Sequence, residues 1–326
     1  MVNSTKVTVS APGKLVVLGD HAVVYGHPAL VMAVGQRMRA TAELSGEPFL
    51  TLDAPDVEIL SYRKSLDDLG SGEIPKGAKS VEFAVRRLFI DGILKSGVTV
   101  QTSSKFSGQF GFGSSGASAV TIIAAVFQLI DGMIDQRKVF DVAMQSVRDS
   151  GSTGSGVDLA AAVYGGLAYF ITGGKVIERL NVPAMHFVIG FSGVKVDTGT
   201  IVAEVKARAD EQPKLYDGYF RSIGVLVDEG RKLAEAGDLR GFGEVMNRNQ
   251  DLLEALGVGS AKLSAMIEGA CAGGALGAKI SGSGKGDCMI ALCESDAIPS
   301  VSTGIAEAGG QVIDVPCLVE GLRLEK

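Results

Sequence analysis

The sequence contains no tryptophan, only four cysteines and no excess of basic residues. Cys271, Cys288, Cys293 and Cys317 all lie in the last third of the chain and form no C-x-x-C pair, so neither a disulfide framework nor a zinc site is expected. The 31 basic and 37 acidic residues give a net charge of −6, which argues against binding to nucleic acid or to an anionic membrane. Free thiols fit a reducing compartment, and we expect a cytoplasmic protein.

Long apolar runs are also missing. Residues 1–6 show no basic segment leading into an apolar one, so no secretory signal is expected. The longest stretch without a charged residue, 106–130, begins with glycine and serine and is not expected to span a membrane.

Glycine, by contrast, is abundant. The chain has 44 glycines, and a typical share of about 7% would give roughly half that number. Glycine permits tight turns and close approach of the backbone to a ligand. Three loops rich in glycine and serine, 108–116, 151–156 and 282–286, each border a predicted strand or helix.

Hydrophobic periodicity predicts an α+β protein of two domains, 1–183 and 184–326, that meet near Asn181-Val182-Pro183. In the first domain we expect strands around Val7 and Val9, a turn at Pro12-Gly13, strands at 15–18, 37–44 and 98–102, helices at 80–94, 117–130, 138–147 and 157–164, and a hairpin at 167–180. In the second we expect strands at 186–191, 279–281 and 289–292 and a helical region from 200 to 256 that is broken near Pro213.

The loop at 108–116 has the parts of a phosphate site. It is not a P-loop, because no Gly-Lys-[Ser/Thr] ends it. Its glycines let backbone N–H groups face a phosphate, and the next helix presents its positive N-terminal end. The hydroxyls of Ser114 and Ser115 could bind phosphate or a divalent ion. The alternative is an ordinary glycine-serine turn with a helix cap.

Three such loops together favour ATP as a ligand. Phosphoryl transfer depends mainly on positioning and charge stabilisation. A kinase therefore needs a cation near the reacting oxygens and a carboxylate near the acceptor hydroxyl. Lys14 and Asp158, which adjoin the first and second glycine segments, are the candidates. Taken singly, each would be an ordinary surface charge or helix-start residue.

The residues around Lys14 resemble the first motif of the GHMP small-molecule kinases, and within them the mevalonate kinases. This motif reads Ala11-Pro12-Gly13-Lys14, then Gly19-Asp20-His21-Ala22-Val23-Val24-Tyr25-Gly26. The family's ATP loop is similar to Gly111-Phe112-Gly113-Ser114-Ser115, and its aspartate motif to Ser155-Gly156-Val157-Asp158. Further similar segments are 246–253, 274–279 and the last loop motif, 279–286. The motifs follow the family's order over nearly the whole chain.

The resemblance implies an N-terminal domain like ribosomal protein S5 and a ferredoxin-like C-terminal domain. It implies transfer of the γ-phosphoryl group of ATP to the 5-hydroxyl of mevalonate, with Mg²⁺ as cofactor. Asp158 would accept or orient the hydroxyl proton, and Lys14 would stabilise the developing charge. A homodimer is a family expectation.

The resemblance also implies the rest of the site. Its residues would be His21, Asp20 and Thr200 for the substrate, Gly111, Gly113, Ser114, Ser115, Gly116, Gly282, Ser283 and Gly284 for ATP, and Ser115 for Mg²⁺.

Several positions depart from the family's pattern. Asp20 replaces a glutamate, which is one methylene longer. Gln109 and Phe110 replace two small residues before the ATP loop, where Phe110 would crowd the loop or pack under the base. Lys285 replaces a glycine and could touch phosphate or be solvated. Asp287 after it is typical of phosphomevalonate kinases.

The largest departure concerns the metal. Related kinases carry a Mg²⁺-binding glutamate where this chain has Val147, and a valine cannot ligate a hard cation. Either Ser115, ATP and water hold the ion, or Asp149 substitutes. We favour the first.

Three other functions remain open. A phosphomevalonate kinase has a phosphorylated acceptor and needs further cations, which Lys195, Lys285 and Arg248 could supply. A mevalonate 3-kinase or decarboxylase shares the scaffold, but pathway decarboxylases typically lack the lysine found here at position 14. A non-catalytic ligand sensor is a different class, and loss of Lys14 or Asp158 would have favoured it.

Overall fold

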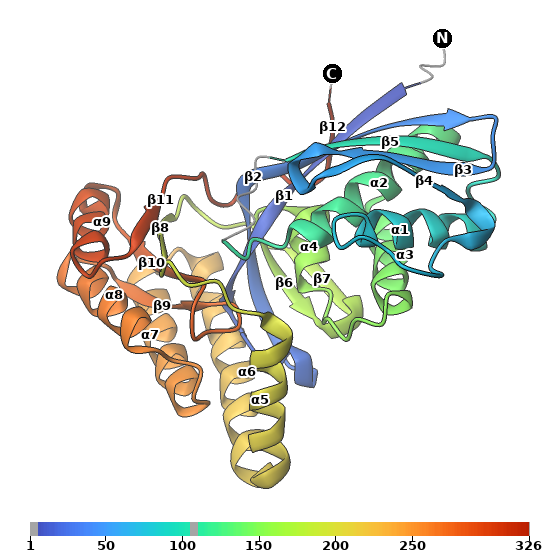
Figure 1. Ribbon diagram of the computed structural model, residues 1–326. Helices are drawn as coiled ribbons and strands as arrows, with labels where there is room; N and C mark the ends of the chain where they lie inside the picture. Colours follow the sequence, from blue (N-terminus) through green and yellow to red (C-terminus); the bar gives the residue numbers. More distant parts are fainter. Residues whose placement is uncertain (1–5, 105–109, 326) are drawn as a thin grey trace.

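The computed structural model describes residues 6–104 and 110–325, which form two sheets with packed helices (Figure 1). The larger sheet has eight strands in the order β12-β1-β2-β5-β3-β4, and β6 and β7 extend it from β2. Its pairs are antiparallel except β3 with β5. The strands are β1 (Lys6–Leu18), β2 (Pro28–Ser45), β3 (Phe49–Ala54), β4 (Ile59–Ser65), β5 (Gly97–Ser104), β6 (Leu167–Ile171), β7 (Val176–Arg179) and β12 (Arg323–Leu324).

The expected turn at Pro12-Gly13 is wrong, because β1 continues through it beside β2. The register shifts there: Pro12 lies opposite Arg37 and Gly13 opposite Val34, so β2 accommodates Gly35 and Gln36 as extra residues. Proline has no N–H for the ladder, and a bulge lets the strand continue past it. The irregularity leaves Lys14 on a strand rather than on a turn.

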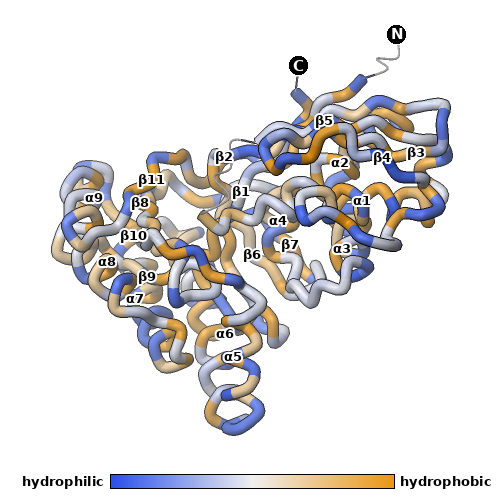
Figure 2. The backbone as a smooth tube through the Cα atoms, viewed as in Figure 1, coloured by the Kyte–Doolittle hydropathy of each residue, from blue (hydrophilic) through white to orange (hydrophobic). Residues whose placement is uncertain are grey.

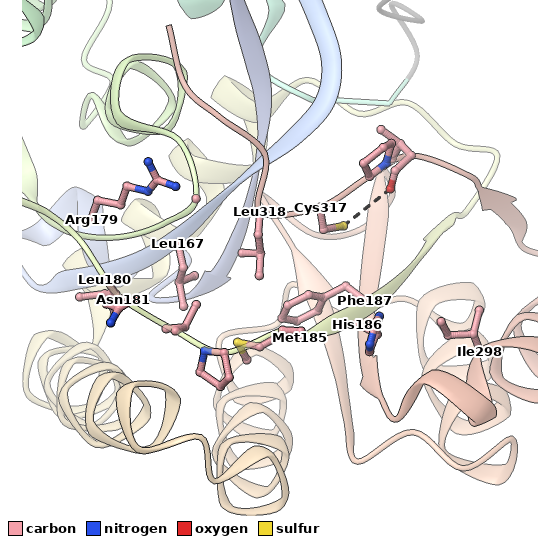
Figure 3. Close-up of a pocket in the computed structure, with 16 residues that line it drawn as sticks. Leu167, Arg179, Leu180, Asn181, Met185, His186, Phe187, Ile298, Cys317 and Leu318 are labelled. Atoms are coloured by element: carbon pink, nitrogen blue, oxygen red, sulfur yellow. Dashed lines mark hydrogen bonds between the residues drawn. The ribbon is translucent and has the colours of Figure 1, made fainter.

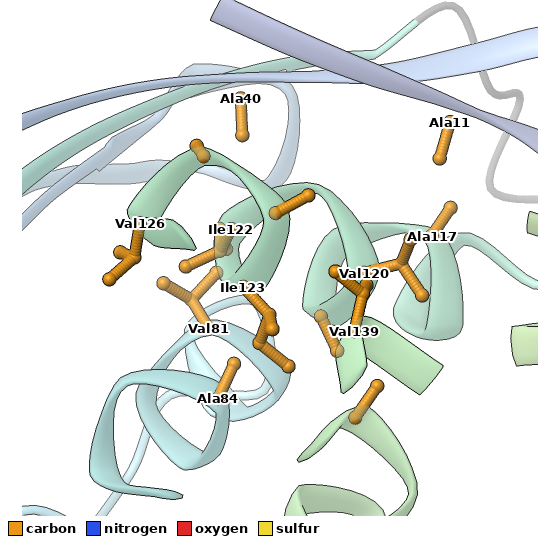
Figure 4. Packing of buried hydrophobic residues seen from close by; sticks show 14 of the residues in the cluster. Ala11, Ala40, Val81, Ala84, Ala117, Val120, Ile122, Ile123, Val126 and Val139 are labelled. Atoms are coloured by element: carbon orange, nitrogen blue, oxygen red, sulfur yellow. The ribbon is translucent and has the colours of Figure 1, made fainter. Parts of the chain in front are cut away.

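Four helices lie on one face of the larger sheet: α1 (Lys79–Ile90), α2 (Ser114–Asp131), α3 (Gln136–Asp149) and α4 (Val157–Tyr164). Of these, α2 and α4 pack against β1 and β2, and α1 and α3 pack mainly against the other helices. In Figure 4, the side chains of α2 fill the space between the sheet, represented by Ala11 and Ala40, and Val81 of α1. Every residue from Gly116 to Phe127 is buried, which explains why this helix is apolar all round.

By length and composition alone, α2 could cross a membrane, and it is the one such helix within 6–104 and 110–325. Two thirds of it (67%) are buried inside the protein, as in the core helix of a folded domain.

The second sheet is antiparallel, in the order β11-β8-β10-β9. Its strands are β8 (His186–Phe191), β9 (Gly277–Ser281), β10 (Cys288–Cys293) and β11 (Gln311–Ile313). The helices of this part of the chain are α5 (Thr198–Glu211), α6 (Pro213–Ala236), α7 (Leu239–Ala255), α8 (Ala261–Ala272) and α9 (Ile298–Glu307). Short 3-10 helices are Ala22–Tyr25, Pro55–Val57, Leu66–Asp68, Thr172–Gly174 and Ser295–Ala297. The α+β class is thus confirmed.

The domain boundary at residue 183 stays a prediction. The C-terminal end of the chain returns to the first domain. β12 returns to the larger sheet, where Leu324 pairs with Val9 and Arg323 with Ser10. The helices α5 and α6 meet at Pro213, as expected, and run side by side to a hydrophilic tip (Figures 1 and 2).

The motif at 246–253 has a structural role at the edge of the second sheet. The N–H of Ala278 donates to Asn247 Oδ1 at 3.0 Å, and the N–H of Ile280 donates to Gln250 Oε1 at 2.9 Å. Side chains of α7 thereby satisfy the free edge of β9, which would otherwise expose unpaired backbone groups.

Candidate active site

The first glycine loop bonds directly to Lys14. The N–H of Lys14 donates to the carbonyl of Phe112 at 2.9 Å, and Lys14 Nζ donates to the carbonyl of Gly111 at 3.3 Å. Gly111 and Gly113 have φ angles of +69° and +77°, a backbone conformation that favours glycine. The loop is therefore shaped by its glycines and held against β1 at Lys14.

Asp158 lies on the opposite side of the same loop. It occupies the second position of α4, directly after Gly156 and Val157. A Cβ built on Gly113 would lie 3.2 Å from Lys14 Cγ and 3.3 Å from Asp158 Cβ. A Cβ on Gly116 would lie 2.4 Å from Asp158 Oδ2. The structure thus brings Lys14 and Asp158 together across the start of α2.

The environment of Asp158 sets its protonation. Burial raises the pKa of Asp158, while the Lys14 ammonium and amide N–H groups at the start of α4 lower it. A carboxylate with a raised pKa is a better proton acceptor than an ordinary surface aspartate. The nearby cation favours the ionised form of the carboxylate.

A cavity of about 610 Å³ opens beside the first turn of α2. It is lined by Ser114 and Ser115, by apolar residues that include Met38 and Val57, and by Lys76 and Lys79 at the start of α1. Cavities of roughly 300–1,000 Å³ hold nucleotide-sized ligands. The amides of the first helical turn have no partner inside the helix and can face a phosphate. Of the predicted ATP residues, Ser114 and Ser115 line this cavity.

The lining of this cavity shows which side chains could hold a metal ion. Eight serines line it, and Ser115 is exposed at its wall. Asp149 does not line it, because its carboxylate pairs with Arg86 at 3.7 Å and Arg87 at 3.5 Å. Among the described residues no cluster of three metal-ligating side chains occurs. The wall offers hydroxyls and one carboxylate, that of Asp56, and such donors fit a Mg²⁺ ion whose other ligands are nucleotide phosphates and water.

A second cluster joins the end of β1 to the third glycine loop. Lys279 Nζ lies 2.6 Å from Asp20 Oδ2, and the two side chains are 0% and 1% exposed. The N–H of Gly282 donates to Asp20 Oδ1 at 2.6 Å. Asp20, expected at the substrate, is thus engaged in a buried ion pair, and its shorter side chain still reaches both partners.

His21 has a strained backbone. Its φ and ψ are +59° and −52°, and the N–H of Ala22 donates to the carbonyl of Asp20 at 2.7 Å, which is the geometry of a γ-turn. His21 Nε2 donates to the carbonyl of Ser283 at 2.9 Å. Burial lowers the pKa of His21, and the Ser283 carbonyl opposes this shift. Strain of this kind persists where surrounding contacts enforce it, and it is common at functional sites.

The third loop is fixed on both sides. The N–H of Lys285 donates to the carbonyl of Val258 at 2.7 Å, and Gly284 packs against the same residue. Ser283 Oγ is buried and has no hydrogen-bond partner within the described ranges, which leaves it available to a ligand. That Gly282, Ser283 and Gly284 bind ATP stays a prediction.

Thr200 lies in the first turn of α5. Its N–H and its hydroxyl donate to Asp197 Oδ2 at 2.8 and 2.9 Å, which caps α5. No hydrogen bond between described residues joins it to Lys14, Asp158 or His21. Its role in substrate binding stays a prediction.

Sequence reasoning missed several residues that the fold places at these clusters. Lys279 was read only as part of a motif, although it is the buried partner of Asp20. Lys76 and Lys79 line the cavity without any motif of their own. The ring of Phe110 packs 5.6 Å from Phe112 and 5.1 Å from Phe191, and its expected position under the base stays a prediction. The family's pattern has small residues at this point of the loop, so comparison with that pattern could not have revealed the contact between the aromatic rings.

A larger cavity, of about 710 Å³, lies where β7, the segment after it and the C-terminal tail meet (Figure 3). Its lining includes Arg179, His186 and Cys317 but no carboxylate. Its candidate proton acceptor is His186 rather than a carboxylate, and none of the three glycine loops lines it. Ser114 and Ser115, two of the predicted ATP residues, line the cavity beside α2 instead.

Gly116 offers a test of how closely Asp158 is positioned. Alanine suits the helical backbone there, but its Cβ would collide with Asp158 Oδ2 at 2.4 Å. We expect Gly116→Ala to lower kcat by at least about tenfold, because displacements near 1 Å can cost about 10²-fold. Steady-state kinetics and thermal unfolding would be measured together, and the melting temperature should change little.

Gly218→Ala in α6 is the matched control, because nothing lies within 4 Å of its Cβ. It should keep kcat and stabilise the helix by up to about 1 kcal/mol. Full activity in Gly116→Ala would contradict a role for Asp158 at this position.

Loop amides, an ammonium and a carboxylate that meet at the start of α2, next to a nucleotide-sized cavity, define a phosphotransferase site. Two family models match the chain: the GHMP kinases N terminal domain over residues 78–166 and the GHMP kinases C terminal domain over 231–310. The chain belongs to the GHMP kinases, with their two-domain fold, and mevalonate kinases are among its relatives.

One curated relative, the mevalonate kinase of Pyrococcus abyssi, is 32% identical over 98% of each chain. The fold is also that of L. major mevalonate kinase in complex with R-mevalonate (TM-score 0.76, 22% identity, 95% of each chain). It is equally that of Streptococcus pneumoniae phosphomevalonate kinase (TM-score 0.80, 20% identity, 95% of this chain and 99% of that one). The fold alone therefore does not decide the acceptor.

Proposed function

We propose that this GHMP kinase transfers the terminal phosphoryl group of ATP to the 5-hydroxyl of mevalonate. The observation that carries the proposal is the placement of Lys14 and Asp158 on either side of Gly113, at the start of α2. The relative that is 32% identical over nearly the full length and is named a mevalonate kinase supports mevalonate as the acceptor.

In this mechanism each residue has one role. Asp158 accepts or orients the proton of the acceptor hydroxyl, because burial raises its pKa and α4 fixes its position. Lys14 stabilises the negative charge on the attacking oxygen and the transferred group. The first-turn amides of α2 bind phosphate oxygens. Mg²⁺, when bound, would neutralise phosphate charge, and the Ser115 hydroxyl would be one of its ligands.

The alternative of a phosphorylated acceptor requires cations that are still available for a second phosphate. Lys285 pairs with Glu204, and Arg248 Nη1 lies 2.7 Å from Glu229 Oε1. Lys195 pairs with Asp287 and lies against Gly111 of the nucleotide loop. The pairings of Lys285 and Arg248, and the position of Lys195 at the nucleotide loop, favour the unphosphorylated alcohol.

The deciding experiment offers the protein ATP and Mg²⁺ with mevalonate, 5-phosphomevalonate or 5-diphosphomevalonate in separate reactions. We expect ADP release with mevalonate alone. The ³¹P spectrum of the product should show splitting by the two protons on carbon 5, because a phosphate at the tertiary 3-position has no such neighbours.

Asp158→Asn serves as the inactive control in the same assay. Turnover only with 5-phosphomevalonate would establish the phosphomevalonate kinase instead, and CO₂ release would establish a decarboxylase. Nucleotide binding without any turnover would indicate a sensor.

A further inference from the structure

The nucleotide loop is attached to the C-terminal sheet as well as to β1. The ring of Phe110 packs edge-on against Phe191 of β8, with centroids 5.1 Å apart. Cys288 Sγ, at the start of β10, donates to the carbonyl of Phe110 at 3.4 Å. Residues from the second sheet therefore border the site where Lys14 and Asp158 meet.

An ion pair from two loops next to that sheet lies directly against the nucleotide loop. Lys195, between β8 and α5, has its Nζ 3.2 Å from Oδ1 of Asp287, which directly precedes β10. A Cβ on Gly111 would lie 3.3 Å from Lys195 Nζ and 3.1 Å from Asp287 Oδ2, so both ends of the pair face this glycine. Lys14 Nζ donates to the carbonyl of the same residue. Two ammonium groups thus flank Gly111, one from β1 and one from the loop after β8.

The backbone holds Asp287 firmly in this position. Its φ is +55°, which is uncommon for a residue other than glycine. Its N–H donates to the carbonyl of Val194 at 2.7 Å, and its carbonyl accepts from the N–H of Ser192 at 2.9 Å. The Asp287 side chain is 8% exposed and that of Lys195 45%. A buried, rigid carboxylate thus orients a half-exposed lysine.

The positive potentials of the two lysines overlap at Cys288. Burial raises the pKa of this thiol to about 12 and Asp287 adds to the rise, whereas Lys14 and Lys195 both oppose it. An ammonium has three donors. The contact with Asp287 leaves Oδ1 without a hydrogen bond, so it does not occupy these donors, and they can bind an anionic ligand.

We propose that Lys195, oriented by Asp287, is a second cation that contacts the terminal phosphoryl group of the nucleotide. The proposal rests on the proposed function only in that the site binds ATP. Lys14 then approaches the transferred group from β1 and Lys195 from the loop after β8. Asp287 is a positioning residue, and it also balances the lysine's charge when no nucleotide is present.

The test compares the affinity for a non-hydrolysable ATP analogue with that for ADP, both with Mg²⁺ and without acceptor. We expect Lys195→Met to weaken binding of the analogue roughly tenfold, because hydrogen bonds to charged groups contribute about 1.5–3 kcal/mol. ADP affinity should change less than about twofold, since ADP lacks the terminal phosphoryl group. Because no acceptor is present, failure of the mevalonate assignment would leave this test intact.

The kinetic arm uses the acceptor that the protein turns over. Lys195→Met should lower kcat roughly 10²-fold, in the range for loss of one charge-stabilising donor. Lys195→Arg should recover part of that loss. Asp287→Asn should lower kcat less than Lys195→Met does, because asparagine tolerates the left-handed backbone but no longer fixes the ammonium.

Lys206→Met is the matched control, because Lys206 also pairs with an aspartate, Asp210 at 2.7 Å, on the exposed surface of α5. It should leave all these quantities unchanged. Equal weakening of the analogue and ADP by Lys195→Met would indicate a structural anchor and overturn the proposal. A change confined to the acceptor's KM would overturn it too, since it would place Lys195 on the acceptor.

Discussion

Replacing Asp158 with asparagine is expected to lower kcat by about 10²–10⁴-fold, the range for a positioned acid–base group. The amide keeps the size of the side chain but cannot take up a proton. Dissociation constants for ATP should change by less than about threefold, because the carboxylate lies beside Gly116 rather than in the wall of the nucleotide cavity. Steady-state kinetics and equilibrium binding on the same preparation would measure both effects. Equal losses in kcat and in nucleotide affinity would indicate a structural role.

The pH profile gives a second readout of the same residue. Burial raises the pKa of Asp158, so kcat of the unmodified enzyme should fall on the acid side at a pH above the ordinary carboxyl range. Activity is lost as the pH decreases through that pKa, because the protonated carboxyl cannot accept a proton. Lys14 lowers this pKa, so in Lys14→Met the residual activity should show its acid limb at still higher pH. If the acid limb of Lys14→Met lies at the same pH as that of the unmodified enzyme, a group other than Asp158 titrates.

Breaking the buried pair between Asp20 and Lys279 is expected to cost about 3–5 kcal/mol of unfolding free energy. Lys279→Met leaves the Asp20 carboxylate buried without its cation, and the two side chains are 1% and 0% exposed. Urea unfolding of the purified variants would measure the loss. Lys206→Met is again the matched control, since its ion pair is exposed, and no measurable loss is expected there.

A double-mutant cycle separates the pair from its surroundings. Asp20→Leu combined with Lys279→Met removes both charges, and we expect the double variant to be more stable than the sum of the single losses implies. Gly282 would still lose its acceptor, so the wild-type stability should not return fully. Additive losses would show that the two side chains do not stabilise each other.

The class of the fold was readable from the sequence because its elements carry strong local signals. The short helix at Val157–Tyr164 and the strand at His186–Phe191 have the predicted bounds. The strands β3 and β4 were not predicted, and β2 was expected only from residue 37 although it begins at Pro28. Long-range pairing extends a strand well beyond the part that its own alternation reveals.

Other errors share this cause. Pro12-Gly13 has the composition of a turn, but β2 accommodates it as a bulge. Asp149 could be proposed for the metal because sequence spacing cannot show that Arg86 and Arg87 already bind it. Lys195 could be proposed as an acceptor-binding cation because its pairing with Asp287 across the third loop is invisible in the sequence.

The sequence by itself determined the kind of chemistry, because glycine loops, a lysine and an aspartate are chemical groups that appear in the chain itself. It also determined the helices and strands whose periodicity is strong. Only the tertiary structure decided which of those groups meet: Lys14 with Asp158 across Gly113, Asp20 with Lys279, and Lys195 with Asp287 against Gly111. These contacts join residues far apart in the chain, and they form only when β1, the helices and the second sheet pack around a common site.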